Sequence, residues 1–251
     1  MAQVSLSDLI SQARGDAPAD LVLRGGQVFD VVTGDMIPGD VAICGDTVAG
    51  IGGAYEGREV VDVTGLTLVP GFIDTHLHIE SSLITPHEFD RCVTPRGITT
   101  VICDPHEIAN VCGVAGVEFM IENGKQTPFK FFFGAPSCVP ATIFETAGAE
   151  VNEKEVDALL ARPEIYYLSE MMNFPGVLHS DPVVMAKIKS AQKHNKPVDG
   201  HAPGLSGEAA KKYIDAGIST DHECFTIEEA LEKLEYSMHI LIREGSAAKN
   251  F

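Results

Sequence analysis

From Leu66 onwards, apolar runs of strand length alternate with segments that carry helix-capping residues. This alternation is typical of βα units, in which helices join parallel strands and cover the sheet. It constrains the fold more than any other feature, because parallel strands need such long crossovers. The expected strands occupy residues 67–74, 98–103, 129–133, 165–170, 197–201, 218–222 and 238–242.

Helix starts between these runs can be read from capping residues. Thr85 and Glu88 have the spacing of a capping box, and Pro86 stands at the first helical position. Asp181 opens an amphipathic segment, and Thr226 begins a second capping box. These signals predict helices between successive strands.

Nearly every expected strand ends in a histidine or an acidic residue. In (β/α)₈ barrels the catalytic groups gather at the carboxyl ends of the strands. The pattern therefore predicts a TIM-like barrel over residues 66–251 rather than an open doubly wound sheet. An eighth strand is missing, and the pattern predicts the start of a seventh helix only at 246–251, so we expect a barrel truncated after about strand seven.

The segment before the barrel has a different sequence pattern. Residues 1–18 read as a polar leader with one short helix. Residues 19–65 hold short strands separated by Gly and Asp turns, which predicts the amino-terminal part of a small β-domain. This domain carries no catalytic constellation of its own.

Composition excludes several classes of protein. The chain has 251 residues, 45% of them hydrophobic, so it can bury a full core. Its net charge of -18 argues against nucleic-acid binding, which depends on basic residues. The six cysteines form no CxxC motif, no secretory signal is visible, and no apolar run would span a membrane. We expect a cytoplasmic protein with reduced thiols and no membrane partner.

His76 and His78 stand at the end of a buried strand. Side chains at i and i+2 point to the same face, so both imidazoles can reach one ion. Imidazole suits Zn, Fe and Mn. An isolated His-x-His would more often be satisfied by backbone hydrogen bonds, but the preceding apolar strand and the adjacent Asp74 favour a metal site here.

Three further strand ends complete this pattern with Glu170, His201 and His222. A carboxylate at the end of an apolar strand is costly unless it is paired or bound to metal, and Glu170 could bridge two ions. Four histidines and one glutamate therefore predict a pair of metal ions. Four of the remaining histidines read as solvated or structural: His87, His179, His194 and His239.

Asp104, His106 and Glu107 follow the second expected strand. They could bind substrate or move protons. The competing interpretation is a proline-containing turn in which Asp104 caps the next helix. We favour a catalytic role for His106 and Glu107, leave Asp104 open between the two readings, and predict that Glu80 and Ser81 help to bind substrate.

Five strings of this sequence resemble one known family. GFIDTHLHIESS, CDPHEIANV, EMMNFPGV, DGHAPG and STDHE occur in the order found in the bacterial adenine deaminases of the amidohydrolase superfamily. The resemblance runs from about residue 20 to the end of the chain. It implies hydrolytic deamination of adenine to hypoxanthine and ammonia, a reaction of purine salvage.

The resemblance also implies a metal arrangement and a mechanism. His76 and His78 would hold one divalent ion, His201 and His222 the other, and Glu170 would bridge them. The ions are expected to be Mn²⁺ or Fe²⁺, with Zn²⁺ as an alternative, and a hydroxide between them would attack C6 of adenine. Many superfamily members bridge their metals with a carboxylated lysine, so Glu170 at this position counts against the dihydroorotase and hydantoinase branches.

One expected family element is absent from the sequence. Members carry an aspartate after the eighth strand that moves a proton from the attacking water, and this chain stops before that position. We therefore expect the truncated chain to be poorly active or inactive, and the full-length form to be a homo-oligomer. The alternatives are an amidohydrolase acting on another cyclic amide or an N-acyl substrate, and a non-catalytic barrel fragment that serves as an assembly module.

Overall fold

The computed structural model describes residues 4–142, 144–245 and 249–250. Its contacts divide the chain into two compact units, Met1–Pro70 and Gly71–Phe251. The expected helix start at 246–251 falls largely outside the described residues. Within the described part, no helix is both long and apolar enough to cross a membrane.

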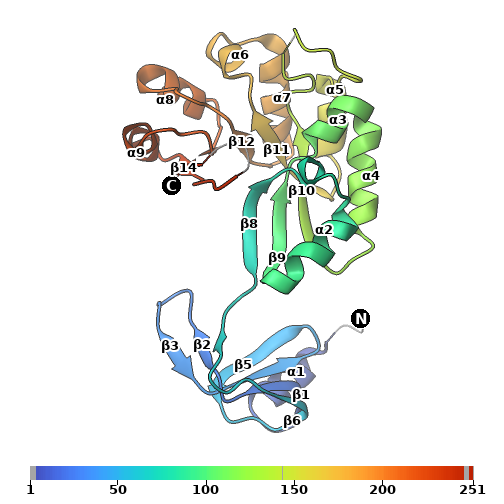
Figure 1. Cartoon of the computed structure of the whole chain (residues 1–251), viewed down its shortest axis with the longest axis vertical. Coiled ribbons are helices and arrows are strands. Elements are labelled where there is room, and N and C mark those ends of the chain that lie inside the picture. The colour runs from blue at the N-terminus through green and yellow to red at the C-terminus, as the bar shows by residue number, and fades with distance from the viewer. Residues whose placement is uncertain (1–3, 143, 246–248, 251) are drawn as a thin grey trace. The chain divides into compact units, whose positions relative to one another are not determined.

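Unit 1 contains one short helix and two small sheets (Figure 1). The larger sheet has the order β5-β4-β1-β6 and the smaller one the order β3-β2-β7. Its buried core consists of Ala19, Val22 and Ala42, with Ala49 and Tyr55 packed against them. The elements are α1 (Leu6–Ala13), β1 (Ala19–Arg24), β2 (Gln27–Phe29), β3 (Met36–Pro38), β4 (Asp40–Cys44), β5 (Thr47–Gly53), β6 (Gly57–Asp62) and β7 (Thr67–Leu68).

The single strand predicted over 67–74 is wrong in its bounds. Thr67 and Leu68 pair with β2 in unit 1, and the next strand begins only at Phe72. Pro70 lies in the interruption, and it has no N–H to donate to a sheet ladder. The first strand of unit 2 therefore begins at Phe72 instead of residue 67, closer to the histidines near its end.

Unit 2 contains all seven predicted strand regions. Five form one parallel sheet in the order β12-β11-β10-β9-β8, and β13 and β14 form a parallel pair beside it (Figure 1). A single bridge from Val198 to Ile218 links the five-stranded sheet to the segment that leads into β13. The strands are β8 (Phe72–Leu77), β9 (Ile98–Cys103), β10 (Lys130–Pro136), β11 (Ile165–Met171), β12 (Val198–Gly200), β13 (Thr220–Asp221) and β14 (His239–Ile240).

Helices connect these strands and cover the sheet. Asp181 and Thr226 accept backbone hydrogen bonds at the predicted starts of α7 and α9, whereas the predicted cap Thr85 makes no side-chain cap bond. The helices are α2 (Pro86–Val93), α3 (His106–Cys112), α4 (Val114–Gly124), α5 (Glu153–Leu160), α6 (Phe174–Leu178), α7 (Pro182–Lys193), α8 (Gly207–Asp215) and α9 (Ile227–Glu235), with short 3-10 turns at Ile79–Ser82 and Thr94–Arg96.

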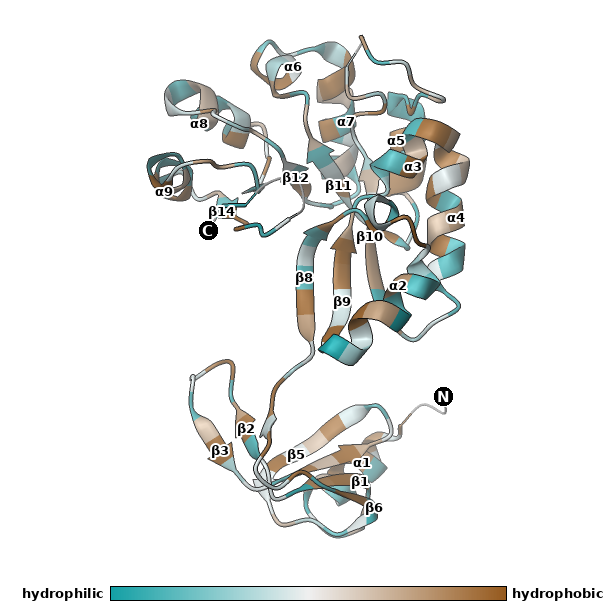
Figure 2. Ribbon diagram, viewed as in Figure 1, coloured by the Kyte–Doolittle hydropathy of each residue, from teal (hydrophilic) through white to brown (hydrophobic). Residues whose placement is uncertain are grey.

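The main core lies between the parallel sheet and these helices. Ile165 and Leu168 of β11 are fully buried and pack in the same cluster as Leu160 of α5 and Ile188 of α7. Figure 2 shows the hydrophobic colouring along β9 and β10, as expected for strands that are buried on both faces. Burial of this apolar surface fixes the strands, and the strands fix the polar residues at their carboxyl ends.

Candidate metal centre

Five side chains from four strand ends meet in unit 2. His76 lies near the end of β8 and His78 directly after it, Glu170 lies near the end of β11, and His201 and His222 follow β12 and β13. The parallel sheet places these ends at one edge because its strands run in the same direction. The structure therefore brings together all five residues that the sequence predicts as metal ligands.

Glu170 is the centre of this group. Its Oε1 lies 2.9 Å from His76 Nε2, 2.8 Å from His78 Nε2 and 3.7 Å from His222 Nε2. Its Oε2 lies 3.2 Å from His201 Nδ1. The two oxygens of one carboxylate thus face different histidines, as a bridging ligand requires.

The histidine rings are packed against each other and oriented by their second nitrogens. The His76 and His222 rings stack with centroids 3.7 Å apart, although they come from the first and the sixth strand of the unit. His78 Nδ1 donates to the carbonyl oxygen of Asp104 at 2.9 Å, which leaves its Nε2 as the acceptor nitrogen that faces Glu170.

Two of the closest atoms in the cluster have no hydrogen-bond partner within the described residues. His76 Nε2 and Glu170 Oε1 are buried and 2.9 Å apart, yet neither makes a hydrogen bond of acceptable geometry. Buried polar atoms are normally satisfied, so such orphans need an explanation. A buried imidazole nitrogen and a carboxylate oxygen that lie this close without a mutual hydrogen bond fit a set of metal ligands.

The electrostatics of the metal-free cluster favour added positive charge. Burial opposes protonation of His76, but the Asp199 and Glu170 carboxylates outweigh it and raise its pKa to about 10. Burial also opposes ionisation of Glu170, but the hydrogen bond between His201 and its Oε2 and the nearby nitrogens of His76 and His78 outweigh burial and lower its pKa. Burial and the nearby His76 lower the pKa of His222 to about 4. A divalent cation would replace the protons that these carboxylates otherwise hold on the histidines.

The donor set fits divalent metal ions. Three subsets in this region place their ligand atoms within 4.8 Å of one another, and each combines imidazole with carboxylate. Such mixed ligands suit Zn, Fe and Mn rather than the all-oxygen preference of Mg or Ca. The subsets are His78 with Asp104, His106 and Glu170; His76 with Asp199 and His222; and Glu170 with His201 and His222.

A second group of polar residues adjoins the histidines. Asp104 Oδ2 accepts from His106 Nδ1 at 2.7 Å, and the His106 ring lies 4.4 Å from that of His78. Asp104 does not cap the next helix, whose N-cap is Pro105. Burial disfavours the charged form of His106, but Asp104 outweighs it and raises the pKa of His106 to about 9.

The predicted substrate-binding residues differ in their surroundings. Ser81 Oγ donates to Glu107 Oε1 at 2.6 Å, and both residues line a cavity of about 650 Å³ together with His76, His78 and His222. Glu80 instead turns to the backbone, where its carboxylate accepts from Ile108 N at 3.2 Å. Ser81 and Glu107 are therefore the members of this group that line the cavity.

Two acidic residues near the cluster were missed by the sequence reasoning. Asp199 Oδ2 lies 3.6 Å from His76 Nδ1, and Glu223 Oε1 lies 3.7 Å from His222 Nε2 and 3.9 Å from His201 Nδ1. Asp199 could have been found, because it precedes His201 by two positions and so shares its side of the strand. Glu223 follows a histidine directly, a position for which strand alternation predicts nothing.

Three of the four histidines predicted to be solvated or structural contact residues outside the cluster. His194 Nε2 is 2.9 Å from Asp157 Oδ1, and His87 Nδ1 is 3.2 Å from Glu88 Oε1. His239 Nδ1 faces the carbonyl oxygen of Ser219 at 3.4 Å. These contacts are local, and none of them involves a member of the cluster.

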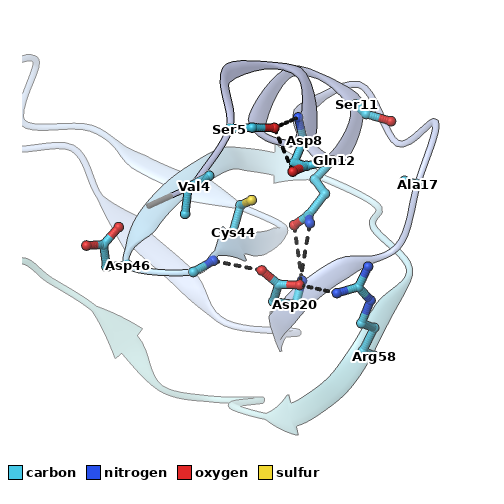
Figure 3. A pocket seen from close by; sticks show the side chains of 11 residues that line it. Val4, Ser5, Asp8, Ser11, Gln12, Ala17, Asp20, Cys44, Asp46 and Arg58 are labelled. Atoms are coloured by element: carbon cyan, nitrogen blue, oxygen red, sulfur yellow. Dashed lines mark hydrogen bonds and ion pairs between the residues drawn. The ribbon is translucent and has the colours of Figure 1, made fainter. Parts of the chain in front are cut away.

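Unit 1 has a cavity of about 540 Å³ next to α1 (Figure 3). Asp20 occupies its wall, where it accepts from Arg58 at 2.6 Å and from the backbone N of Gly45 at 2.8 Å. The side chain of Gln12 bonds both the backbone and the carboxylate of Asp20. These polar groups satisfy one another, and the candidate metal-ligand groups found among the described residues all lie in unit 2.

Comparison with known proteins agrees with this picture. The model of the amidohydrolase family matches residues 67–245. Adenine deaminase 1 of Agrobacterium fabrum is 53% identical over 246 residues, and an adenine deaminase of Cereibacter sphaeroides is 55% identical over the same length. The matches cover 98% of this chain but 42% and 43% of those proteins, so the chain spans less than half the length of these curated relatives.

Solved structures match the fold at low sequence identity. Atrazine chlorohydrolase TrzN from Arthrobacter aurescens with zinc gives a TM-score of 0.60 at 14% identity, covering 92% of this chain and 73% of that one. N-acetyl-D-glucosamine-6-phosphate deacetylase from Mycobacterium smegmatis gives 0.54 at 16% identity, covering 80% and 59%. The predicted amidohydrolase-type α/β barrel, present here as a curved partial sheet, is confirmed. The chain belongs to the amidohydrolase family.

Proposed function

We propose that this chain supplies a binuclear divalent-metal centre to an enzyme that hydrolyses adenine to hypoxanthine and ammonia. The observation that carries the proposal is Glu170, whose Oε1 faces His76 and His78 while its Oε2 faces His201. The similarity to curated adenine deaminases over 98% of the chain supports adenine as the substrate. Family membership implies divalent metal use, and we propose Mn²⁺ or Fe²⁺, with Zn²⁺ as the alternative.

The residues of the chain would have two kinds of role in this reaction, metal binding and proton transfer. His76, His78, His201 and His222 would hold two ions on either side of Glu170, and the bound ions would lower the pKa of water so that hydroxide is available near neutral pH. Glu107, whose Oε1 accepts from Ser81 at the cavity wall, would exchange a proton with a ring nitrogen of adenine. His106 Nδ1 donates to Asp104 Oδ2 at 2.7 Å beside the ring of His78, and His106 would exchange the second proton with the departing ammonia.

Metal content tests the centre directly. We expect the purified chain to bind two Mn²⁺ ions and the Glu170→Gln variant to lose both, because the amide nitrogen cannot serve as a ligand oxygen. The matched control is His194→Gln, since His194 pairs with Asp157 outside the cluster. Absence of stoichiometric metal from the parent chain would contradict the proposal.

Ammonia release tests the substrate. Any ammonia release by this chain should be weak, should come from adenine rather than from dihydroorotate or a hydantoin, and should be abolished by Glu170→Gln. Hydrolysis of either cyclic amide in preference to adenine would contradict the assignment. Full metal loading with neither turnover nor binding of adenine would instead favour an assembly role.

A further inference from the structure

Helix α9 carries a lysine that is buried directly behind two of the histidines. Lys233 is 1% exposed, so its ammonium group has exchanged water for protein partners. A buried charge of this kind is costly unless it is paired and hydrogen-bonded on all sides. The proposed catalytic steps do not use Lys233, so its burial calls for another explanation.

The ammonium group joins the two loops that bear His201 and His222. Lys233 Nζ donates to the carbonyl oxygen of Ala202 at 2.7 Å and to Asp221 Oδ2 at 2.6 Å. Ala202 directly follows His201, and Asp221 directly precedes His222. One side chain therefore holds the immediate neighbour of each histidine.

Asp221 reinforces the same connection with its second oxygen. Asp221 Oδ1 accepts from Ala202 N at 3.1 Å and from Glu223 N at 3.0 Å. Ala202 is thus held at both its N–H and its carbonyl group, and the backbone on both sides of His222 is held as well. Asp221 is itself completely buried, so water does not compete for these bonds.

Two glutamates on the same face of α9 extend the contact. Glu229 Oε1 accepts from Lys233 at 2.7 Å and from Gly204 N at 2.9 Å. Glu232 Oε1 accepts from Gly207 N at 2.8 Å. Positions 229, 232 and 233 are neighbours on one helical face, so α9 presents a single surface to the loop after β12.

The residues around Lys233 do not form a second metal site. Asp221, Cys224 and Glu229 lie close enough together to bind an ion. Lys233 Nζ, however, already lies among them, 2.6 Å and 2.7 Å from the two carboxylates and 3.8 Å from Cys224 Sγ. The ammonium group supplies the positive charge that a cation would otherwise bring.

We propose that Lys233 is a positioning residue that sets the separation of His201 and His222, so that both can bind the same metal ion. The inference rests on the proposed metal centre. Lys233 touches neither histidine side chain and acts only through Ala202 and Asp221. Loss of the tether should weaken the ion held by His201 and His222 and leave the ion held by His76 and His78 in place.

Cobalt binding to the purified chain tests this role. In the Lys233→Met variant we expect one Co²⁺ to bind as in the parent chain and the other about tenfold or more weakly, the range found when residues that orient metal ligands are replaced. The visible absorption of Co²⁺ should change as well, because it reports ligand geometry and not stability.

Lys196→Met is the matched control. Lys196 Nζ also donates to backbone carbonyl groups, those of Leu160 at 2.6 Å and Arg162 at 2.8 Å. Lys196, however, lies before the amino end of β12, whereas His201 follows the carboxyl end of that strand. Its replacement should lower stability while both Co²⁺ ions and their spectrum are retained. This separates a positioning effect from a general loss of stability.

A second variant covers the case in which Lys233→Met does not fold. Lys233→Gln combined with Asp221→Asn removes both charges, so no uncompensated carboxylate is left beside His222, and the same weakening of one ion is expected. Two tightly bound ions with an unchanged spectrum in a folded variant would overturn the inference. A parent chain that binds no Co²⁺ would overturn the metal centre itself, and the inference with it.

Discussion

Glu170 is the residue on which the chemistry of the site depends. Its carboxylate is 3% exposed, and a lone charge at that depth would be strongly destabilising. Histidine nitrogens surround both oxygens and lower its pKa against the effect of burial. Glu170 therefore stays ionised at a position where its two oxygens face different histidines.

Asp199 allows a test of how His76 is oriented for metal binding. Its Oδ2 lies 3.6 Å from His76 Nδ1, and its Oδ1 accepts from Thr220. We expect Asp199→Asn to lower metal affinity about tenfold, because the charge that orients His76 is lost while the side-chain volume is kept. Competition with a chelator measures the change.

Asp157→Asn is the control for this prediction, since Asp157 pairs with His194 and Lys193 outside the cluster. It should leave metal affinity unaltered. Equal affinities in the Asp199 and Asp157 variants would show that Asp199 does not orient His76.

Residues at strand ends could be predicted from the sequence, whereas their partners could not. His76, His78, Glu170, His201 and His222 each follow an apolar run, and parallel strands bring such ends together. The contacts of Asp104 with His106 and of Ser81 with Glu107 depend on turns, whose geometry strand periodicity does not encode. Lys233 reads in the sequence as one polar position of an amphipathic helix, so its burial became evident only in the structure.

Among the elements, β12 and β13 approach each other closely at Gly200. A Cβ added there would lie 2.1 Å from the carbonyl oxygen of Thr220 and 2.8 Å from Ile218 Cγ2. Glycine in a strand often marks such a close approach of backbone. The spacing of the two strands sets the spacing of the histidines that follow them.

Gly200→Ala should therefore force β12 and β13 apart. We expect a loss of roughly 1–3 kcal/mol in the free energy of unfolding, as for other overpacked sites, together with weaker metal binding. Urea unfolding and chelator competition measure the two effects.

Gly34→Ala provides the comparison. Gly34 has a positive φ of 80° and nothing within 4 Å of an added Cβ, so its replacement strains the backbone without crowding a neighbour. It should lower stability and leave metal binding as it is. If Gly200→Ala behaved in the same way, strand spacing would not control the site.

The order of the elements followed from the sequence, but several boundaries did not. All seven strand regions of unit 2 were anticipated because their apolar runs are long compared with the turns between them. The interruption of the predicted strand 67–74 near Pro70 was missed, since the apolar run continues across two strands that belong to different units. The brevity of β13 and β14 was also missed, because hydrophobic pattern does not report how many ladder bonds form.

For the whole molecule, the titration of the histidines predicts how stability depends on pH when metal is removed. The pKa values of His76 and His106 are raised to about 10 and about 9 from 6.5. A raised pKa contributes stability in full below 6.5, and the contribution is lost as the pH rises through the folded value. The pKa of His222 is lowered to about 4, so protonation of His222 removes stability as the pH falls from 6.5 towards 4.

The chain treated with EDTA should therefore lose stability between pH 7 and pH 10. The metal-loaded chain is the matched control, and its stability should be nearly constant over that range because bound ions replace the protons. Urea unfolding followed by circular dichroism compares the two. A metal-free chain that became more stable on the alkaline side would contradict the assigned shifts.

The stacking of His76 on His222 also has a consequence for biosynthesis. Most of unit 2 lies between these residues in the sequence, so His76 leaves the ribosome long before its partner exists. A nascent chain can offer a passing ion only His76 and His78, a weak pair of ligands. Capture of an ion by the complete proposed ligand set must then follow the synthesis of β13 and the folding of the sheet.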